Sequence, residues 1–394
     1  MIVLQILFWV ASFLVVYSYA IYPIILFFIT RKKTLNAQVY RDSNEIPEII
    51  IWMAVYNEEK VIAQKLESLI NTDFPRDKMN IWIGSDASDD NTSRTIESYQ
   101  AQYDCIRFFD YKARSGKAGV LNKMRNTLLA ERGDIEKLIL IPTDANVFFE
   151  NNTITALIKH FANPSIGQVG ANILNTGLTQ KGISAQEKTY IQHENKLKYH
   201  EGLLGLMQGA FGGCYAVRAN LWPIIPTGFL MEDFFVSMYV FSKEKKSILT
   251  TDAICYEDVS DEVAEEFKRK TRISTGNFQN LRYYWRLLTN FDLLAFCFWS
   301  HKGLRWISPL FLLVSLVTSL SLVNIALYKL LFMGQLLLLI TPIIEKVLKT
   351  IGWNVKIVRS IAYFYQMNAA LVVGFWRFLK GVKTSAWTPT KRNL

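Results

Sequence analysis

Cysteine is scarce in this chain, and so are acidic residues in its last third. The four cysteines are Cys105, Cys214, Cys255 and Cys297. They lie far apart, have no spacing typical of a metal site, and indicate buried thiols in a reducing compartment. From residue 268 onward only Asp292 and Glu345 are acidic, against 18 Lys and Arg residues.

The basic part of the chain is also the part with long apolar runs. It carries +16, whereas residues 1–267 carry −6, within a total of +10. Basic residues interleaved with apolar runs favour contact with anionic lipid headgroups or a phosphorylated ligand. They argue against nucleic acid as a partner.

A long apolar run opens the chain. Residues 1–30 are nearly free of charge and are followed by Arg31-Lys32-Lys33. About 20 apolar residues cross a bilayer, and basic residues after the run predict that this end faces the cytoplasm. A cleaved signal peptide is the alternative, since Ser18-Tyr19-Ala20 resembles a cleavage site. No basic residue precedes the run, however, and it continues to Ile29, so we expect a transmembrane helix.

The last third of the chain offers further membrane candidates. Residues 283–299 are rich in aromatic side chains and predict an interfacial helix, and spans are candidates at 304–327, 330–344 and 361–379. The basic tail 380–392 is expected in the cytoplasm. Because only an even number of spans returns the chain there, one candidate is expected to lie in the interface or to re-enter the membrane.

Residues 47–172 alternate between strand and helix patterns. Apolar runs predict strands at 49–55, 79–83, 106–109, 138–141 and 167–171, and apolar spacing predicts helices over 58–70 and about 117–131. This alternation predicts an α/β fold with a mostly parallel sheet. Ligands bind beyond the carboxyl ends of the strands in such sheets.

Polar segments follow several of these strands. They are Tyr56-Asn57-Glu58-Glu59, Ser85-Asp86-Ala87-Ser88-Asp89, Ala113-Arg114-Ser115-Gly116-Lys117-Ala118-Gly119 and Thr143-Asp144-Ala145-Asn146. Any one of them could be a set of helix caps. Because they meet at one edge of one sheet, together they predict a binding site.

These four motifs, in this order, closely resemble those of the membrane-bound family 2 glycosyltransferases. The resemblance covers about residues 47–285. It implies a Rossmann-like nucleotide-sugar-binding domain of the fold called GT-A, with transmembrane helices at both ends. Each motif alone is a weak signal, but four in order are a strong one.

The resemblance implies donor-binding roles for residues of these motifs. They are Tyr56, Asn57, Glu59, Asp86, Arg114, Lys117, Asp144, Arg269 and Arg272. Asp86 is implied to contact the nucleoside, whereas Asp89 is expected to cap the next helix. Lys117 would place a charge on the diphosphate. The alternatives are a solvated basic loop for Arg114 and Lys117, and a helix N-terminal acid for Glu59.

A diphosphate leaving group implies a divalent cation, Mg²⁺ or Mn²⁺, which prefers oxygen ligands. Asp144 is the implied ligand at the strand end. The family usually has Asp-x-Asp here, whereas this chain has Asn146 in the second position. The Asn146 carbonyl oxygen can coordinate a metal, but without a charge. Asn146 as a helix cap is an equal alternative.

The acceptor side is implied by two later segments. Residues 209–218 form a glycine-rich turn entering a strand, and Gly212 and Gly213 are implied to line the acceptor site. The acidic pair Glu232-Asp233 follows an apolar run, where burial is costly unless the acids are used. The resemblance makes Asp233 the general base that takes the acceptor hydroxyl's proton, with Glu232 as its neighbour or an acceptor contact. Capping of a helix over 233–242 is the alternative.

Processive members of the family carry Gln-x-x-Arg-Trp, and this chain departs from that motif. Residues 269–273 read Arg-Lys-Thr-Arg-Ile, so that only Arg272 matches. Arg269 and Arg272 share a helical face, and Arg272 is implied to help neutralise the diphosphate. The missing Trp, which stacks near the acceptor sugar, weakens the case for a polysaccharide synthase. A basic helix lying on lipid headgroups is the alternative.

The sequence thus predicts a multi-pass enzyme of the cell (inner) membrane with a cytoplasmic catalytic domain. We expect an inverting hexosyl- or N-acetylhexosaminyl-transferase that takes a UDP-linked donor. Its acceptor would be a lipid-linked sugar or a glycan, in cell-surface or exopolysaccharide biosynthesis, with other biosynthetic proteins as partners. A processive polysaccharide synthase and a non-catalytic membrane scaffold are the alternatives. A nucleotidyltransferase would need a glycine-rich basic loop near its N-terminus, which is absent.

The predicted boundaries are 1–30 (transmembrane helix), 31–46 (linker), 47–285 (GT-A domain), 286–302 (interfacial helix), 303–380 (membrane helices) and 381–394 (basic tail).

Overall fold

The computed structural model describes residues 1–35, 40, 45–176, 184–258 and 262–382. The chain divides into two compact units. One contains residues 30–261 with 382–394, and the other contains residues 1–29 and 262–381. We call them the α/β unit and the helical unit. The predicted basic tail falls almost entirely outside the described residues.

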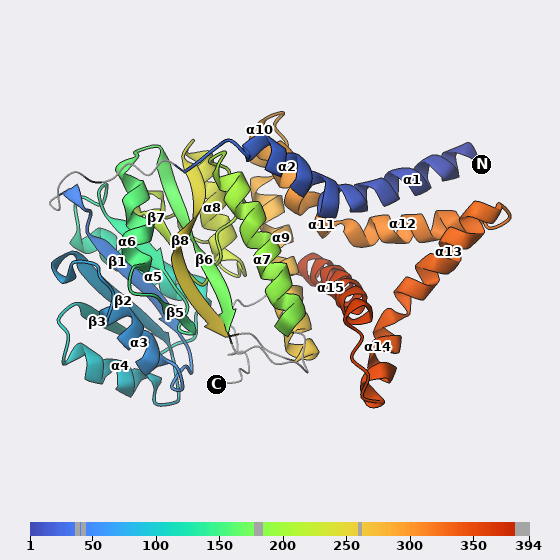
Figure 1. Ribbon diagram of the computed structural model, residues 1–394. Helices are drawn as coiled ribbons and strands as arrows, with labels where there is room; N and C mark the ends of the chain where they lie inside the picture. Colours follow the sequence, from blue (N-terminus) through green and yellow to red (C-terminus); the bar gives the residue numbers. More distant parts are fainter. Residues whose placement is uncertain (36–39, 41–44, 177–183, 259–261, 383–394) are drawn as a thin grey trace. The chain divides into compact units, whose positions relative to one another are not determined.

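The α/β unit is built on an eight-stranded sheet (Figure 1). Its strands are β1 (Ile49–Val55), β2 (Met79–Asp86), β3 (Ile106–Tyr111), β4 (Ile139–Pro142), β5 (Val147–Phe149), β6 (Ile166–Thr176), β7 (Tyr215–Arg218) and β8 (Lys246–Asp258). They lie in the order β3-β2-β1-β4-β7-β6-β8-β5. β1 to β4 run parallel to one another, as do β6 and β8, whereas β7 and β5 pair antiparallel with their neighbours. The predicted α/β fold with a mostly parallel sheet is confirmed.

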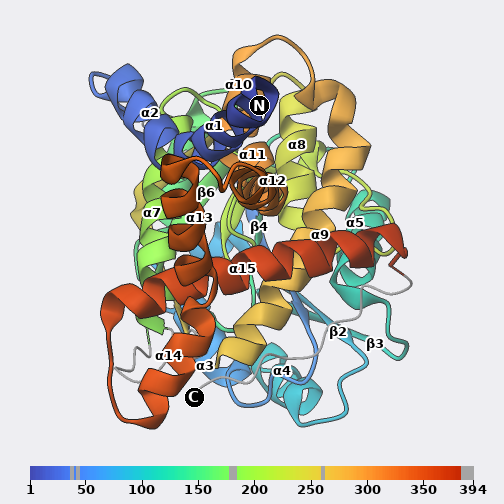
Figure 2. The ribbon, with the colours of Figure 1, turned by 90° about the vertical axis from the view of Figure 1, so that its right-hand side faces the viewer.

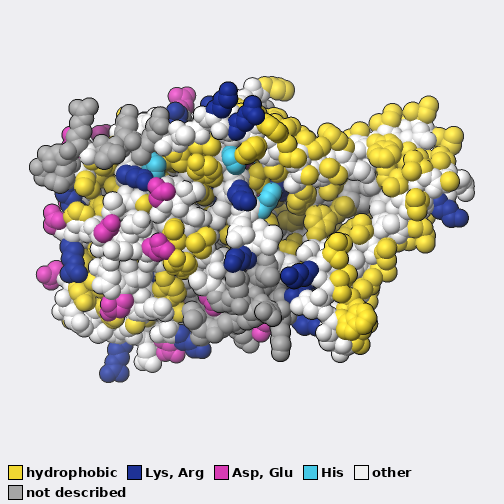
Figure 3. All heavy atoms as spheres, viewed as in Figure 1, with side chains coloured by type: hydrophobic (Ala, Val, Ile, Leu, Met, Phe, Trp, Pro, Cys, Tyr) yellow, Lys and Arg dark blue, Asp and Glu magenta, His cyan; other side chains and the backbone are white. Residues whose placement is uncertain are grey.

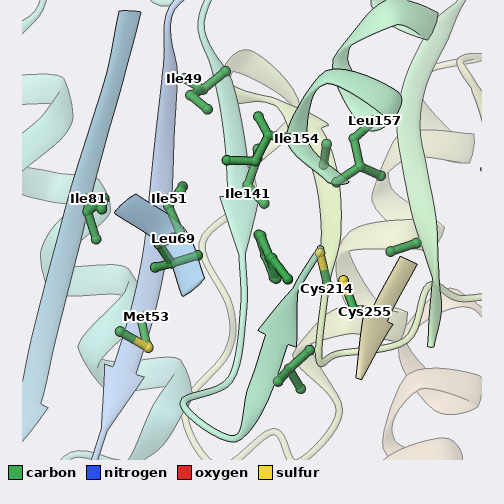
Figure 4. Close-up of a cluster of buried hydrophobic side chains, with 14 of the residues drawn as sticks. Ile49, Ile51, Met53, Leu69, Ile81, Ile141, Ile154, Leu157, Cys214 and Cys255 are labelled. Carbon is green, nitrogen blue, oxygen red and sulfur yellow. The ribbon is translucent and has the colours of Figure 1, made fainter. Parts of the chain in front are cut away.

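The helices of this unit cover both faces of the sheet. The helices are α3 (Ile62–Ile70), α4 (Thr92–Gln100), α5 (Gly116–Glu131), α6 (Thr153–Ile158), α7 (Ser184–Gly202) and α8 (Glu232–Ser242). Successive side chains of a strand point to opposite faces. Ile49, Ile51 and Met53 therefore pack in one apolar cluster with residues of α3 and α6, such as Leu69 and Leu157 (Figure 4). On the other face α5 packs so closely that a Cβ at Gly84 would lie 2.4 Å from Val120.

The predicted elements differ from the observed ones chiefly at their ends. β1 has the predicted bounds, but β2 continues through Asp86, so that this residue lies at the end of a strand. The helix predicted from residue 58 begins at Ile62, because residues 58–61 form a turn. β5 and β8 were not predicted; β8 has exposed Thr251 and Asp252 in its middle, which breaks the apolar pattern.

The helical unit consists of the N-terminal apolar helix and the helices after residue 262 (Figures 1 and 2). Its elements are α1 (Ile2–Val16), the π-helical turn η1 (Tyr17–Ile21), α2 (Tyr22–Thr30, whose last residue falls in the α/β unit), α9 (Val263–Leu288), α10 (Leu293–Phe298), the π-helical turn η6 (Trp299–Gly303), α11 (Leu304–Trp306), α12 (Ser308–Ser321), α13 (Ala326–Leu339), α14 (Thr341–Thr350) and α15 (Lys356–Leu379). Within the described residues, the helix from Ile2 to Thr30 is long and apolar enough to cross a membrane. The count rises to three spans if the two bent pairs, residues 293–321 and 326–350, each form one.

Helix α9 runs through the predicted end of the GT-A domain at residue 285. It packs against α15 (Figure 2), with hydrogen bonds from Ser274 Oγ to the Leu371 carbonyl and from Thr275 Oγ1 to the Gly374 carbonyl, at 3.0 and 3.1 Å. The helical unit includes the chain from residue 262 onward, and the predicted end of the GT-A domain at residue 285 stays a prediction. The segment 286–302, predicted as one interfacial helix, holds the end of α9, a break, α10 and most of η6.

Candidate active site

Two loops at the carboxyl edge of the sheet are locked together. Asn57, after β1, and Asp89, after β2, exchange two hydrogen bonds: Asn57 Nδ2 donates to Asp89 Oδ1 at 2.5 Å, and the Asp89 amide donates to Asn57 Oδ1 at 3.0 Å. Glu59 accepts from both the backbone and the side-chain nitrogen of Asn91, each at 3.1 Å. Asn57 and Ala87 have positive φ angles of 54° and 61°. The left-handed backbone is disfavoured for Ala, and here the paired loops hold it in place.

These contacts settle two alternatives left open by the sequence. Asp89 was expected to cap α4, but it pairs with Asn57, and Asp90 Oδ1 accepts from the Thr92 amide at the helix start, at 2.9 Å. The cap prediction for Asp89 is wrong, because the N-cap of α4 is Asn91, two residues later. Glu59 binds the opposite loop rather than the start of α3. The implied donor-binding roles of Asn57 and Glu59 stay predictions.

Asp86 is fully buried and organises the start of α5. Its carboxylate accepts from the Ser115 and Gly116 amides at 2.6 and 3.0 Å, and from Arg114 Nε at 3.0 Å. A carboxylate at a helix N-terminus is stabilised by the helix dipole and the unpaired amides. The Arg114 guanidinium lies over the Tyr56 ring, 3.3 Å from its centroid. Asp86, Arg114 and Tyr56 are thus brought together, and their implied donor-binding roles stay predictions.

Lys117 connects the carboxylates after β4 and at the start of α8. Its ammonium group lies 2.6 Å from Asp144 Oδ1 and 2.6 Å from Glu232 Oε1. Burial acts to lower the pKa of Lys117, but the two carboxylates outweigh burial and hold it well above its usual value. Lys117 is therefore no solvated loop residue, and its charge is fixed within the site.

Asp233 lies next to this ion-pair network, in the first turn of α8. It is 7% exposed, and a Cβ at Gly212 would lie 2.9 Å from its Oδ2 atom. Burial, then repulsion by Glu232, raises the pKa of Asp233 to about 6, against the opposing effect of Lys117. Met231 is the N-cap of α8, so Asp233 does not occupy the capping position. A carboxylate with a pKa near neutrality suits a general base.

The Gly212–Gly213 turn joins the two halves of this site. The Gly213 carbonyl accepts from the Asp144 amide at 3.2 Å and from Thr143 Oγ1 at 2.8 Å. Gly212 leaves room for the Asp233 carboxylate, as described above. Their implied acceptor-lining role stays a prediction, but the structure places them between Asp144 and Asp233.

Asn146 precedes β5 rather than a helix, so the helix-cap interpretation is wrong. Its side-chain nitrogen lies 3.5 Å from Glu257 Oε1 on the adjacent strand β8. The described residues contain no group of three or more His, Cys, Asp or Glu side chains arranged to hold a metal ion. Asp144 and Glu232 nevertheless bind one cation, the Lys117 ammonium, so this pair of carboxylates suits a cation. Their carboxylate oxygens are ligands of the hard kind that Mg²⁺ and Mn²⁺ prefer. That the Asn146 carbonyl oxygen joins them as a ligand stays a prediction.

Two residues of the site were missed at the sequence level. Tyr215 is 1% exposed, and its hydroxyl has no hydrogen-bond partner among the described residues. Burial, then the charges of Glu232, Asp233 and Asp144, raises its pKa well above the usual value. The second is Lys65, a fully buried lysine beneath the Asp144 loop. Its presence on the apolar face of α3 was the available signal.

Arg269 and Arg272 belong to the helical unit. Arg269 pairs within α9 with Glu266, with Nε 2.8 Å from Oε2, and Arg272 is exposed. Their implied contacts with the diphosphate stay predictions.

Comparison with known proteins identifies the family. The family model "Glycosyl transferase family 2" matches residues 50–220, and "Glycosyl transferase family group 2" matches residues 184–344. The two models together match residues 50–344, and the chain belongs to the family 2 glycosyltransferases.

Two proteins of named activity are similar in sequence to this chain. The chain is 25% identical over 253 residues to the β-monoglucosyldiacylglycerol synthase of Synechocystis, covering 61% of this chain and 50% of that protein. It is 24% identical over 272 residues to the poly-β-1,6-N-acetyl-D-glucosamine synthase of Staphylococcus epidermidis, covering 66% of this chain and 63% of that one. The chain thus spans between half and two thirds of the length of these two relatives.

A solved structure has the same fold. The mannosyltransferase PcManGT of Pyrobaculum calidifontis, in complex with GDP-Man and Mn²⁺, superposes with a TM-score of 0.69 at 19% identity. The match covers 95% of this chain and 99% of that one.

Proposed function

We propose that this chain is an inverting, membrane-bound glycosyltransferase that transfers a sugar from a UDP-linked donor to a lipid-linked sugar or glycan acceptor at the cytoplasmic membrane surface. The observation that carries the proposal is the meeting of Asp144, Lys117, Glu232 and Asp233 at the carboxyl edge of a GT-A-like sheet. A hexosyl or N-acetylhexosaminyl group is the transferred unit, in cell-surface or exopolysaccharide synthesis.

The donor side rests on charge and loop geometry. Asp86 and Arg114 form an ion pair next to Tyr56, which offers a flat ring and a hydroxyl group to a nucleoside. The Lys117 ammonium would turn from the carboxylates to the diphosphate, where its positive charge would stabilise the leaving group. Asp144 and Glu232, together with the Asn146 carbonyl oxygen, would hold a divalent cation, whose charge would neutralise the diphosphate.

The acceptor side rests on Asp233. An acceptor hydroxyl that attacks the anomeric carbon must lose its proton, and a carboxylate within hydrogen-bond reach can take it. With a pKa of about 6, Asp233 is mostly ionised at neutral pH and still basic enough to accept the proton. Glu232 beside it keeps that pKa raised.

The membrane side rests on apolar surface. Exposed large apolar residues cover α1, α12 and α13, among them Phe13, Leu313 and Leu330 (Figure 3). Patches of this extent on a soluble protein mark contact with another surface. We propose that the helical unit is embedded as a multi-pass segment and that the α/β unit faces the cytoplasm, because Arg31-Lys32-Lys33 follows the first helix.

The test is nucleotide release by the purified chain. A panel of UDP- and GDP-sugars is incubated with the protein, a lipid extract and Mn²⁺ or Mg²⁺, and the released nucleotide is measured. We expect release from a UDP-sugar that requires the metal, and loss of release in Asp144→Ala. No release from any donor by a folded wild-type protein would overturn the proposal.

A further inference from the structure

Lys65 occupies a position where an apolar residue would be expected. It lies on α3 with Ile62, Leu66 and Leu69, which all point into the core, and it is 0% exposed. None of the ion pairs between described residues includes it. Burying an ammonium group without a carboxylate partner is costly, and an apolar side chain of similar volume at such a site is often neutral or stabilising. The core alone therefore gives no reason for a lysine here.

The Lys65 ammonium group contacts the two residues that flank the Asp144–Asn146 loop. It donates to Thr143 Oγ1 at 2.9 Å, immediately before the loop, and to the Val147 carbonyl, immediately after it. Its third side faces the Phe149 ring, 4.0 Å from the centroid. The loop itself is closed by the Val147 amide, which donates to the Asp144 carbonyl at 3.2 Å. Lys65 thus clamps both ends of this turn.

The same contact extends toward the acceptor side. Thr143 Oγ1 accepts from Lys65 and donates its own proton to the Gly213 carbonyl at 2.8 Å. That carbonyl also accepts from the Asp144 amide. Gly212, the preceding residue, lies against Asp233. A continuous set of hydrogen bonds therefore runs from Lys65 through Thr143 to the turn that adjoins the base.

We propose that Lys65 is a positioning residue for the reaction: through Thr143 and the Val147 carbonyl it fixes the Asp144–Asn146 loop in the orientation that binds the metal–nucleotide. This inference rests on the proposed function. Groups that orient metal ligands without touching the metal commonly change affinity by ~10- to 100-fold when removed. Lys65 reaches the reactants only through these neighbours.

The experiment measures binding rather than activity, on the full-length chain in detergent. Isothermal titration gives the Kd of UDP with Mn²⁺ for the wild type, Lys65→Met, Thr143→Val, Thr143→Ser and the double variant. We expect Lys65→Met and Thr143→Val each to raise this Kd by ~10-fold or more. Thr143→Ser keeps the hydroxyl and should bind within ~2-fold of wild type. The Kd of the double variant should be no higher than that of the weaker-binding single variant, because both substitutions remove the same contact.

Leu69→Ala is the matched control. It lies one turn further along α3 in the same core, and it should lower the melting temperature without changing the Kd, since it contacts no part of the loop's hydrogen bonds. Unchanged UDP–Mn²⁺ affinity in folded Lys65→Met overturns the inference. If Lys65→Met does not fold, unchanged affinity in Thr143→Val overturns it instead. A wild type that binds neither UDP nor GDP with Mn²⁺ would refute the proposed function, a different result from either of these.

Discussion

Asp233 is 7% exposed, and its pKa of about 6 has burial as the largest cause and Glu232 as the second. Both causes disfavour the carboxylate relative to the carboxylic acid. At neutral pH the ionised Asp233 carboxylate therefore lowers the stability of the folded protein, but it is a stronger base than an ordinary carboxylate. Catalysis and stability make opposite demands on this residue, and each can be measured.

The catalytic demand predicts the effect of Asp233→Asn. The substitution preserves shape, and Asn Oδ1 can still accept from the Phe234 amide, so fold and donor binding should persist. Transfer should fall by ~10²-fold or more, the scale of a positioned base. In the wild type, kcat/KM should decline below a pH of about 6, where Asp233 takes up its proton.

The control for this measurement is Asp252→Asn. Asp252 forms an ion pair with Lys159 at the surface of the same unit, so its loss should leave transfer unchanged. Near-normal turnover in Asp233→Asn, measured beside this control, would remove Asp233 from the role of base.

The stability demand predicts a pH-dependent effect of the same substitution. The folded-state pKa of Asp233 lies above the ordinary value of 3.8. The folded protein therefore binds more protons than the unfolded chain between pH 3.8 and about 6, and stability falls as the pH rises through this window. Asp233→Asn removes the titrating group. It should raise the free energy of unfolding by up to ~3 kcal/mol above pH ~6, at 1.36 kcal/mol per pKa unit, and have little effect below pH ~4.

Melting temperatures of the two proteins from pH 4 to pH 8 test this expectation. A gap that opens between pH ~4 and pH ~6 agrees with it. A constant gap at every pH would show that the pKa of Asp233 is not raised by its surroundings.

At the scale of the element, α5 brings the parts of the site together. Its first amides bind Asp86 at the end of β2, and its second residue, Lys117, reaches Asp144 after β4 and Glu232 on α8. One helix N-terminus thus holds three segments of the chain in register. Lys117 also occupies the carboxylates that a divalent cation would need.

This arrangement predicts that Lys117 and a metal ion compete. Lys117→Met removes the ammonium group but keeps the length and apolar stem of the side chain. Charges ~4 Å apart interact by about 4 kcal/mol near a protein surface, so Mn²⁺ alone should bind at least ~10-fold more tightly to this variant. Affinity for UDP with Mn²⁺ should gain less or fall, because the diphosphate loses its cation.

Titration of each protein with Mn²⁺, followed by electron paramagnetic resonance of the free ion, tests the competition. Lys123→Met on the same helix is the control, since Lys123 contacts Ser115 Oγ rather than either carboxylate. Equal or weaker Mn²⁺ binding by Lys117→Met would show that the ammonium group does not compete for the metal's ligands.

The sequence predicted those elements whose apolar pattern is continuous, and it missed those whose burial changes along their length. β1 is buried on both faces, so its seven apolar residues gave its bounds without help from its neighbours. β8 follows no such rule, because its middle is exposed and its neighbours β6 and β5 are set only by the tertiary fold. Local pattern predicts an element when burial is uniform along it.

The site was predicted in the same unequal way. Asp86, Asp144 and Asp233 lie in ordered motifs, so their residue types were sufficient to single them out. Lys65 and Tyr215 lie in segments whose pattern is apolar, and their importance comes from contacts with residues far along the chain. The pairing of Asp89 with Asn57 also depended on the approach of two loops, which spacing alone does not encode.

At the scale of the whole molecule, the chain combines an α/β unit with a helical unit of limited membrane-spanning capacity. Between one and three helical segments of the described residues could cross a bilayer, by length and composition. A channel for a growing polysaccharide needs several helices around it. We therefore predict, as part of the proposed function, an acceptor that stays in the membrane rather than a polymer that is extruded through it.

The number of sugars added should accordingly be one or a few per acceptor. A flat aromatic ring makes broad apolar contact with a sugar. Ile273, where the processive motif has Trp, offers a smaller, non-planar surface. Membranes containing the enzyme are incubated with labelled donor, and the products are sized and extracted into organic solvent. We expect short, lipid-extractable products whose yield rises with added lipid acceptor.

Long polymer made without added acceptor would contradict this expectation and would point to another aromatic platform. Of the two nearby candidates, Tyr284 is 7% exposed and Trp285 is 54% exposed, so Trp285→Ala would then be the variant expected to shorten the polymer.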